Sequence, residues 1–207
     1  RLHTCEGSTD QVSDELLCTN YARKVKQRYQ KHEAFFRSFG ADVPQLASKI
    51  LSFLEDYESQ KRFSKAGYIH GDPVFSNVLL THDGRVKFLD MRGALGDVLT
   101  TCGDVAYDLS KVYQSLCGYD AIILDVPVDA AGAQTLAKLR SVFATWLASN
   151  YPSVKMRDVR LIVAAHYFCI VPLHDNLHHQ RQFLAKARWL LEADDDASGT
   201  GPDAVVA

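Results

Sequence analysis

Apolar residues recur every three to four positions along much of this chain, the spacing of helices that bury one face. Residues 13–39 fit one long helix or two short ones. A second helix is predicted from Asp42, a capping residue followed by a proline in the first turn, to about residue 62. Further helices are expected at 104–117, 129–149, 156–171 and 175–193. The segment 156–171 is apolar on most faces, so we expect it at the centre of the fold.

One stretch departs from the helical pattern. Residues 78–81 and 85–90 are β-branched and apolar, and a His-Asp-Gly turn separates them, which is typical of a β-hairpin. The predicted fold class is therefore α+β, predominantly α, with one small hairpin. We expect a ragged N-terminal segment over residues 1–12, one domain over residues 13–193, and a disordered tail over residues 194–207 that lacks any apolar stripe.

Composition narrows the class of protein. The chain has 207 residues, 47% hydrophobic and 23% charged, as in an ordinary globular protein with a real core. Its net charge of -2 creates no overall field for nucleic acid or an anionic membrane, so neither is expected as a partner. The longest apolar run, Leu161 to Leu173, is too short to span a bilayer, and the first residues carry no secretion signal. We expect a cytoplasmic protein.

Cysteine and histidine patterns give little sign of metal binding. The five cysteines are odd in number, scattered and without a CxxC pair, which favours free thiols in a reducing compartment over disulfides or zinc. His174, His178 and His179 include an HxxxH spacing that can place two imidazoles on one helix face. No third ligand is evident, so we interpret them as a solvated or core-edge cluster.

Candidate chemistry is concentrated around the predicted hairpin. His70-Gly71-Asp72 is followed by Asn77, and the second strand of the hairpin ends at Asp90. Because a hairpin returns the chain to its starting point, Asp72, Asn77 and Asp90 can converge. Taken singly, Asp72 before a proline or Asn77 could simply belong to a turn. Together, their oxygen atoms suit Mg²⁺, which is normally shared with substrate phosphates in phosphoryl transfer.

A family resemblance is carried by three motifs: HGDPVFSN at 70–77, FLD at 88–90 and GDVAYDLSKV at 103–112. In these motifs the chain resembles the aminoglycoside phosphotransferase and choline kinase superfamily, small-molecule kinases with a protein-kinase-like fold. The resemblance covers roughly residues 40–190 and implies the C-terminal lobe of that fold, with ATP and Mg²⁺ as cofactors. A glycine at position 71, where protein kinases have arginine, favours a small-molecule kinase and argues against regulation by loop phosphorylation.

The resemblance also implies roles for individual residues. Asp72 would be the catalytic base that accepts the proton of the substrate hydroxyl, while Asn77 and Asp90 would hold the metal ions that bridge the ATP phosphates. His70 and Gly71 would shape the loop. Asp104 and Asp108 would support it by capping the next helix and anchoring the loop from below. Arg92 is placed to contact a phosphate or an acidic substrate, and a plain salt bridge is an equal alternative.

The chain departs from this family at its N-terminal side. Only 69 residues precede His70, and they show helical periodicity without the glycine-rich strand–turn–strand segment that covers the phosphates. The chain is therefore either a fragment of a longer polypeptide or a degenerate relative, and its non-Met start favours a fragment. We expect a missing N-terminal lobe or domain of the same polypeptide as a partner, and little activity from these 207 residues alone.

The sequence is compatible with three functional hypotheses. The leading hypothesis is an ATP- and Mg²⁺-dependent phosphotransferase acting on a hydroxyl of an amino alcohol, an aminoglycoside-like amine or a sugar. Acidic residues near the loops favour a cationic acceptor: Asp97, Asp120, Asp125 and Asp175. The rival is a non-catalytic, pseudokinase-like binding or regulatory module of a multidomain protein. A helical scaffold with an accidental motif would place Asp72, Asn77 and Asp90 far apart.

Overall fold

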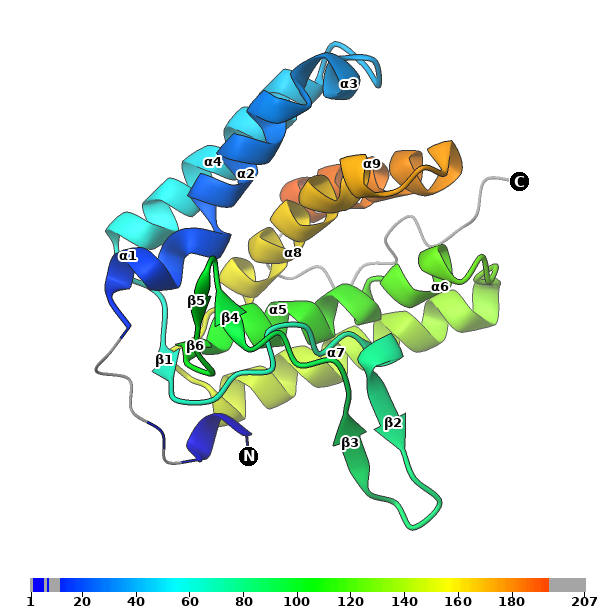
Figure 1. Ribbon diagram of the computed structural model, residues 1–207. Coiled ribbons are helices and arrows are strands. Elements are labelled where there is room, and N and C mark those ends of the chain that lie inside the picture. The colour runs from blue at the N-terminus through cyan, green and yellow to red at the C-terminus, as the bar shows by residue number, and fades with distance from the viewer. Residues whose placement is uncertain (1, 6, 8–11, 194–207) are drawn as a thin grey trace.

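The computed structural model, shown in Figure 1, describes residues 2–5, 7 and 12–193. It is 63% helix and 7% strand, which confirms a predominantly helical α+β chain. The predicted tail at 194–207 lies outside the described residues. The helices are α1 (Asp14–Leu17), α2 (Ala22–Lys31), α3 (Glu33–Arg37), α4 (Val43–Ser59), α5 (Val105–Leu116), α6 (Tyr119–Ile123), α7 (Ala130–Asn150), α8 (Met156–Ile170) and α9 (Leu177–Glu192).

The described strands form three antiparallel pairs of two strands each. They are β1 (Lys65–Ala66) with β6 (Gly103–Asp104), β2 (Val78–Leu80) with β3 (Val86–Phe88), and β4 (Ala94–Leu95) with β5 (Val98–Leu99). The β2–β3 hairpin lies where the sequence predicts it, with Val78 opposite Phe88, and it projects from the helical body (Figure 1). The other two pairs were not predicted.

Helix α8 forms the centre of the molecule, as its apolar sequence predicts. It packs against α2, α4, α5 and α9, and nearly all of its side chains are buried. The Phe36 and Phe168 rings stack with centroids 4.4 Å apart and join α3 to α8. No helix of the described residues has the length and hydropathy needed to cross a membrane.

The N-terminal region differs most from expectation. In place of one or two helices over residues 13–39, the chain forms α1, a 3-10 turn at Cys18–Asn20, α2 and α3. The expected ragged segment includes a 3-10 turn at Leu2–Thr4, where the His3 ring contacts Asp108 and Tyr151 at 3.0 and 2.9 Å. Sequence periodicity could not show these contacts because they join residues more than a hundred positions apart.

Candidate active site

The loop that begins at His70 is held by a buried carboxylate. Asp108, in the first turn of α5, accepts hydrogen bonds of 2.7 Å from the backbone amides of both His70 and Gly71. Hydrogen bonds to an ionised acceptor are stronger than those between neutral groups. Asp108 therefore fixes the backbone immediately before Asp72.

Asp104 supports the same region from the start of α5. It is the N-cap of the helix and accepts a hydrogen bond of 3.0 Å from the Ala106 amide. The hydroxyls of Tyr21 and Tyr57 donate to its other oxygen at 2.5 and 2.6 Å, which ties α2 and α4 to α5. Burial raises the pKa of Asp104, although these donors and the Ser64 amide act in the opposite direction.

Glycine is required at position 71 for two reasons. Its φ of +83° lies in the left-handed region that side chains disfavour. A Cβ atom there would also lie 2.8 Å from the Cβ of Arg92, closer than carbon atoms can approach. The Arg92 amide donates to the His70 carbonyl at 2.9 Å, so the two chain segments run in direct contact at this point.

Asp72 follows this glycine with its side chain partly open to solvent. One carboxylate oxygen, Oδ1, lies 3.1 Å from the ammonium of Lys111, whereas a third of the side-chain surface stays exposed. The backbone is held from both sides, since the Asp72 amide donates to His70 Nδ1 at 3.2 Å and the Asn77 side-chain amide donates to the Asp72 carbonyl at 3.0 Å. The charged group is thus presented on a rigid loop.

The hairpin brings Asp90 back to this loop. The Leu89 amide donates to the Asn77 carbonyl at 2.9 Å, and the Arg92 amide donates to the His70 carbonyl. Asp90 lies between these two hydrogen bonds, so its backbone adjoins both ends of the 70–77 loop. It is exposed and adopts a φ of +56°, an uncommon conformation that costs about 1 kcal/mol or more and is frequent at functional sites.

Asn77 and Asp90 are the residues that the sequence resemblance predicts as metal ligands. The side-chain nitrogen of Asn77 donates to the Asp72 carbonyl, so the side-chain oxygen of Asn77 points away from this hydrogen bond. The described residues contain no group of three His, Cys, Asp or Glu side chains arranged to hold a metal ion. A metal at this place would therefore depend on an amide oxygen, one or two carboxylates and oxygen atoms from a ligand, which is a donor set suited to Mg²⁺.

Several polar atoms around the loop are buried without a hydrogen-bond partner. Among the described residues these are His70 Nε2, Asp72 Oδ1, Gln114 Nε2 and Asp120 Oδ2. The Asp72 oxygen has Lys111 at 3.1 Å as an ion pair, without the angle of a hydrogen bond. Unsatisfied buried polar atoms cost free energy and are rare in folded proteins, and four of the eight such atoms among the described residues lie around this loop.

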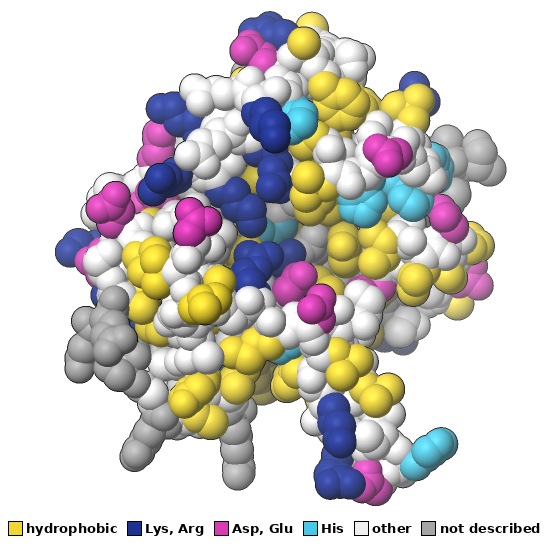
Figure 2. Space-filling view, in the orientation of Figure 1, with side chains coloured by type: hydrophobic (Ala, Val, Ile, Leu, Met, Phe, Trp, Pro, Cys, Tyr) yellow, Lys and Arg dark blue, Asp and Glu magenta, His cyan; other side chains and the backbone are white. Residues whose placement is uncertain are grey.

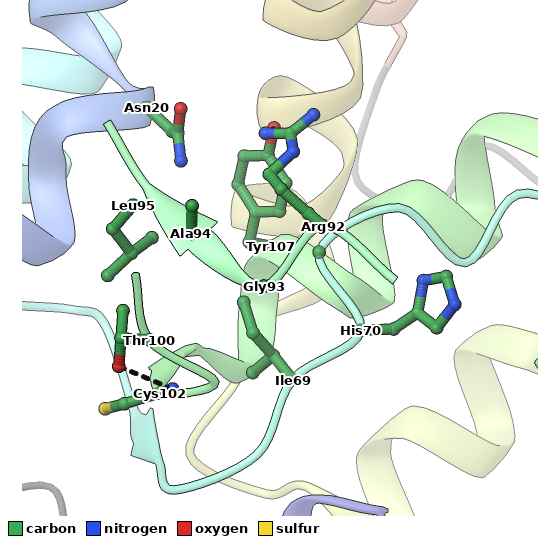
Figure 3. Close-up of a pocket in the computed structure, with 11 residues that line it drawn as sticks. Asn20, Ile69, His70, Arg92, Gly93, Ala94, Leu95, Thr100, Cys102 and Tyr107 are labelled. Carbon is green, nitrogen blue, oxygen red and sulfur yellow. Dashed lines mark hydrogen bonds between the residues drawn. The ribbon is translucent and has the colours of Figure 1, made fainter. Parts of the chain in front are cut away.

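Arg92 packs against Tyr107 of α5. Its guanidinium donates to the Tyr107 hydroxyl at 2.9 Å and lies 5.6 Å from the ring centroid. Figure 3 shows Arg92 and Tyr107 pointing to the side of the loop where Asn20 lies, while the His70 ring points the other way. No carboxylate of the described residues pairs with Arg92, so the salt-bridge alternative does not describe this arginine.

Two lysines of the site were missed from the sequence. Lys111 is 8% exposed on α5, where it also donates to Gln114 at 3.1 Å, and Lys24 lies half-buried on α2. A sequence signal existed for Lys111, because it lies three residues after Asp108 and so on the same face of the helix predicted at 104–117. A lysine is rarely buried without a partner, so its position could have indicated a site.

The remaining candidate groups have structural partners. His179 Nε2 lies 2.6 Å from Asp125, and His178 lies beside Gln182, so the histidines form a helix-edge cluster within the described residues. Asp120 accepts a hydrogen bond of 2.8 Å from the Ser76 amide and so helps to hold the loop. The five cysteines form no disulfide among the described residues.

Comparison with known proteins adds no family to this description. No family model matches the chain, and neither curated proteins nor solved structures show a significant similarity to it. The functional conclusion therefore depends on the residues and geometry of the site.

Proposed function

We propose that the described residues form the C-terminal lobe of a cytoplasmic, kinase-like phosphotransferase that moves the γ-phosphoryl group of ATP to a hydroxyl of a small molecule. Asp72 acts as the base that accepts the hydroxyl proton. The observation that carries this proposal is the loop from His70 to Asn77: two amides held by Asp108, one carbonyl held by Asn77, and a partly exposed carboxylate between them. A general base must be positioned rigidly within reach of its substrate.

Mg²⁺ and ATP are the cofactors that fit this site. Asn77 and Asp90 would hold the metal, and the bound ion would supply positive charge for the phosphate oxygens. The residues of the chain itself contribute by positioning the reacting groups. Lys111, 3.1 Å from Asp72, adds a fixed positive charge beside the base and is suited to stabilise the anionic phosphoryl group during transfer.

A second lobe from the same polypeptide would complete the nucleotide site. The described strands form only two-stranded pairs, so this part of the chain has no sheet that could cover the phosphates. The β2–β3 hairpin and its flanks expose large apolar side chains, which favours a covering partner: Leu79, Leu80, Val86, Phe88, Leu89 and Met91. The partner that we propose for this surface is the second lobe of the same polypeptide.

Nucleotide binding and phosphoryl transfer test the proposal separately. Mg²⁺-ATP binding is measured by calorimetry on this chain and on the longer polypeptide, and transfer is measured as phosphate incorporation into a mixture of hydroxyl compounds. Asp72→Asn should lower transfer by about 100-fold or more with little change in nucleotide affinity, because a general base acts in the transition state. Asp90→Ala should instead weaken Mg²⁺-ATP binding. The exposed Asp97→Asn serves as the control for loss of one carboxylate.

Two results would overturn the proposal. Equal loss of nucleotide affinity in Asp72→Asn and Asp90→Ala would contradict the division of roles. Absence of both Mg²⁺-ATP binding and transfer in the longer polypeptide would favour the alternative, a non-catalytic binding or regulatory module. The alternative is supported by the lack of a phosphate-covering sheet within the described residues.

A further inference from the structure

Two positively charged side chains, Lys24 and Arg92, line a hollow beside the loop of Asp72, and a third, Lys111, forms an ion pair with Asp72. They come from three separate parts of the chain: Lys24 on α2, Arg92 after β3, and Lys111 on α5. Figure 2 shows Lys and Arg side chains gathering in the middle of this face and continuing over the region of α2. Convergence of cations from distant segments requires the folded structure, unlike a run of basic residues in sequence.

Two adjoining depressions make up the hollow. Arg92, Tyr107 and Gly71 line the first, and Lys24 and His166 line the second. Asn20 lines both, which makes them neighbours, and Figure 3 shows Asn20, Arg92 and Tyr107 on the same side of the loop. The Tyr107 ring of the first depression and the His166 ring of the second are in contact, with centroids 4.8 Å apart.

The positive charge of the hollow is only partly neutralised. Among the described residues, neither Lys24 nor Arg92 has a carboxylate within ion-pair distance, and Lys111 has Asp72 alone. Asp108, the other nearby carboxylate, is occupied by the amides of the loop and by His3. Clustered cations without counter-ions repel one another, and an anion that binds among them relieves this cost.

The positive charge shifts the pKa values of two neighbouring side chains, Tyr107 and His166. Burial acts to raise the pKa of Tyr107, yet Lys24, Arg92 and Lys111 together hold that pKa below its ordinary value. Burial lowers the pKa of His166 well below its usual range, and the same three cations lower it further. The His166 ring also contacts the Ser110 hydroxyl, with Nε2 2.8 Å from Oγ.

We propose that this hollow binds an oxyanion, a phosphate or carboxylate group of the acceptor molecule, through Lys24 and Arg92. This inference rests on the proposed phosphotransferase function and specifies its substrate class. Because Gly71 lines the hollow and directly precedes Asp72, an acceptor anchored there by its anionic group would place a neighbouring hydroxyl near the base. This substrate class differs from the cationic acceptor that the sequence favours, and two of the carboxylates behind that expectation have partners within the chain: Asp125 pairs with His179, and Asp120 holds the Ser76 amide.

An NMR titration of the 207-residue chain with four related compounds tests the subsite. Glycerol 3-phosphate and glycerate carry the two anionic groups, glycerol carries none, and choline is cationic. We expect one or both anions to bind and glycerol and choline to produce no shifts. Lys24→Gln and Arg92→Gln should each weaken anion binding by about tenfold, the effect of one charge-assisted contact. Lys138→Gln, an exposed lysine on α7, should leave it unchanged.

A parallel titration with Mg²⁺-ATP separates this inference from the proposed function. Nucleotide binding without anion binding would overturn the subsite and leave the phosphotransferase intact. Anion binding without nucleotide binding by either this chain or the longer polypeptide would support the subsite and overturn the phosphotransferase. If Mg²⁺-ATP displaces glycerol 3-phosphate and Lys24→Gln weakens both ligands equally, the cations serve the nucleotide and the acceptor assignment is wrong. Circular dichroism of each variant verifies that it is folded.

Discussion

The Lys111 ammonium lies 3.1 Å from the Asp72 carboxylate, joining helix α5 to the loop that carries the proposed base. Lys111 is largely buried, whereas a third of the Asp72 side-chain surface is exposed. A charge fixed in this way needs no reorganisation when an anionic group arrives, which is the condition for strong electrostatic stabilisation. The proposed phosphotransferase function depends on this pair.

Replacing Lys111 should affect transfer more than nucleotide binding. We expect Lys111→Met to reduce phosphoryl transfer by about 100-fold, the effect of removing one positioned donor from a developing charge. Mg²⁺-ATP affinity, measured by calorimetry, should change little. Lys138→Met, on the exposed face of α7, is the matched control. A loss of nucleotide affinity as large as the loss of transfer would place Lys111 in the nucleotide site.

Asp108 should determine the rigidity of the loop. Asp108→Asn removes the charge and one of the two acceptors that hold the His70 and Gly71 amides, so we expect a loss of about 2 kcal/mol in the free energy of unfolding. Hydrogen exchange of these two amides should accelerate. Asp129→Asn, an exposed N-cap of α7 where asparagine caps equally well, should cost little. Unchanged exchange at both amides would contradict the anchoring role.

Two glycines with similar backbone angles allow the contact at Gly71 to be isolated. Gly84→Ala changes a residue with φ +77° and no atom within 4 Å, so it should cost about 1 kcal/mol from backbone strain alone. Gly71→Ala adds a clash with the Cβ of Arg92 and should cost clearly more in the same urea denaturation experiment. Equal costs would show that the two chain segments separate easily at this point.

His166 should make the protein sensitive to mild acid. Its pKa is lowered in the folded state by burial and by Lys111, Lys24 and Arg92, so below pH 6.5 the unfolded chain binds a proton that the folded chain does not. The free energy of unfolding should therefore fall as pH decreases through this range, by up to about 1.4 kcal/mol per pH unit.

Substitution at position 166 checks this assignment. Between pH 7.5 and 5, the free energy of unfolding of His166→Gln should change less with pH than that of the unsubstituted protein. This expectation holds whatever the stability of the variant at pH 7.5. His82→Gln, on the exposed turn of the hairpin, should keep the original slope. The lowered pKa of His174, caused first by its burial, contributes in the same direction and is present in both variants. An unchanged slope in His166→Gln would contradict the prediction.

The elements predicted from local pattern agree with the structure within a few residues. Helices α4, α7, α8 and α9 and the β2–β3 hairpin have apolar spacing or turn residues that act over short stretches of chain. The region before α4 was less predictable. Its helices are interrupted near Tyr21, whose hydroxyl bonds to Asp104 83 positions away. The spacing of apolar residues along the sequence gives no information about such a distant partner.

The sequence by itself determined the candidate residues, since His70, Asp72, Asn77 and Asp90 stand at spacings that a loop and a hairpin can bring together. Only the tertiary structure decided their surroundings. The packing of α2 and α5 around the loop brings Lys24 and Arg92 to one hollow and Lys111 to Asp72. The physical reason is that helix and turn formation follow from neighbouring residues, whereas electrostatic surroundings arise from segments that meet only when the core is packed.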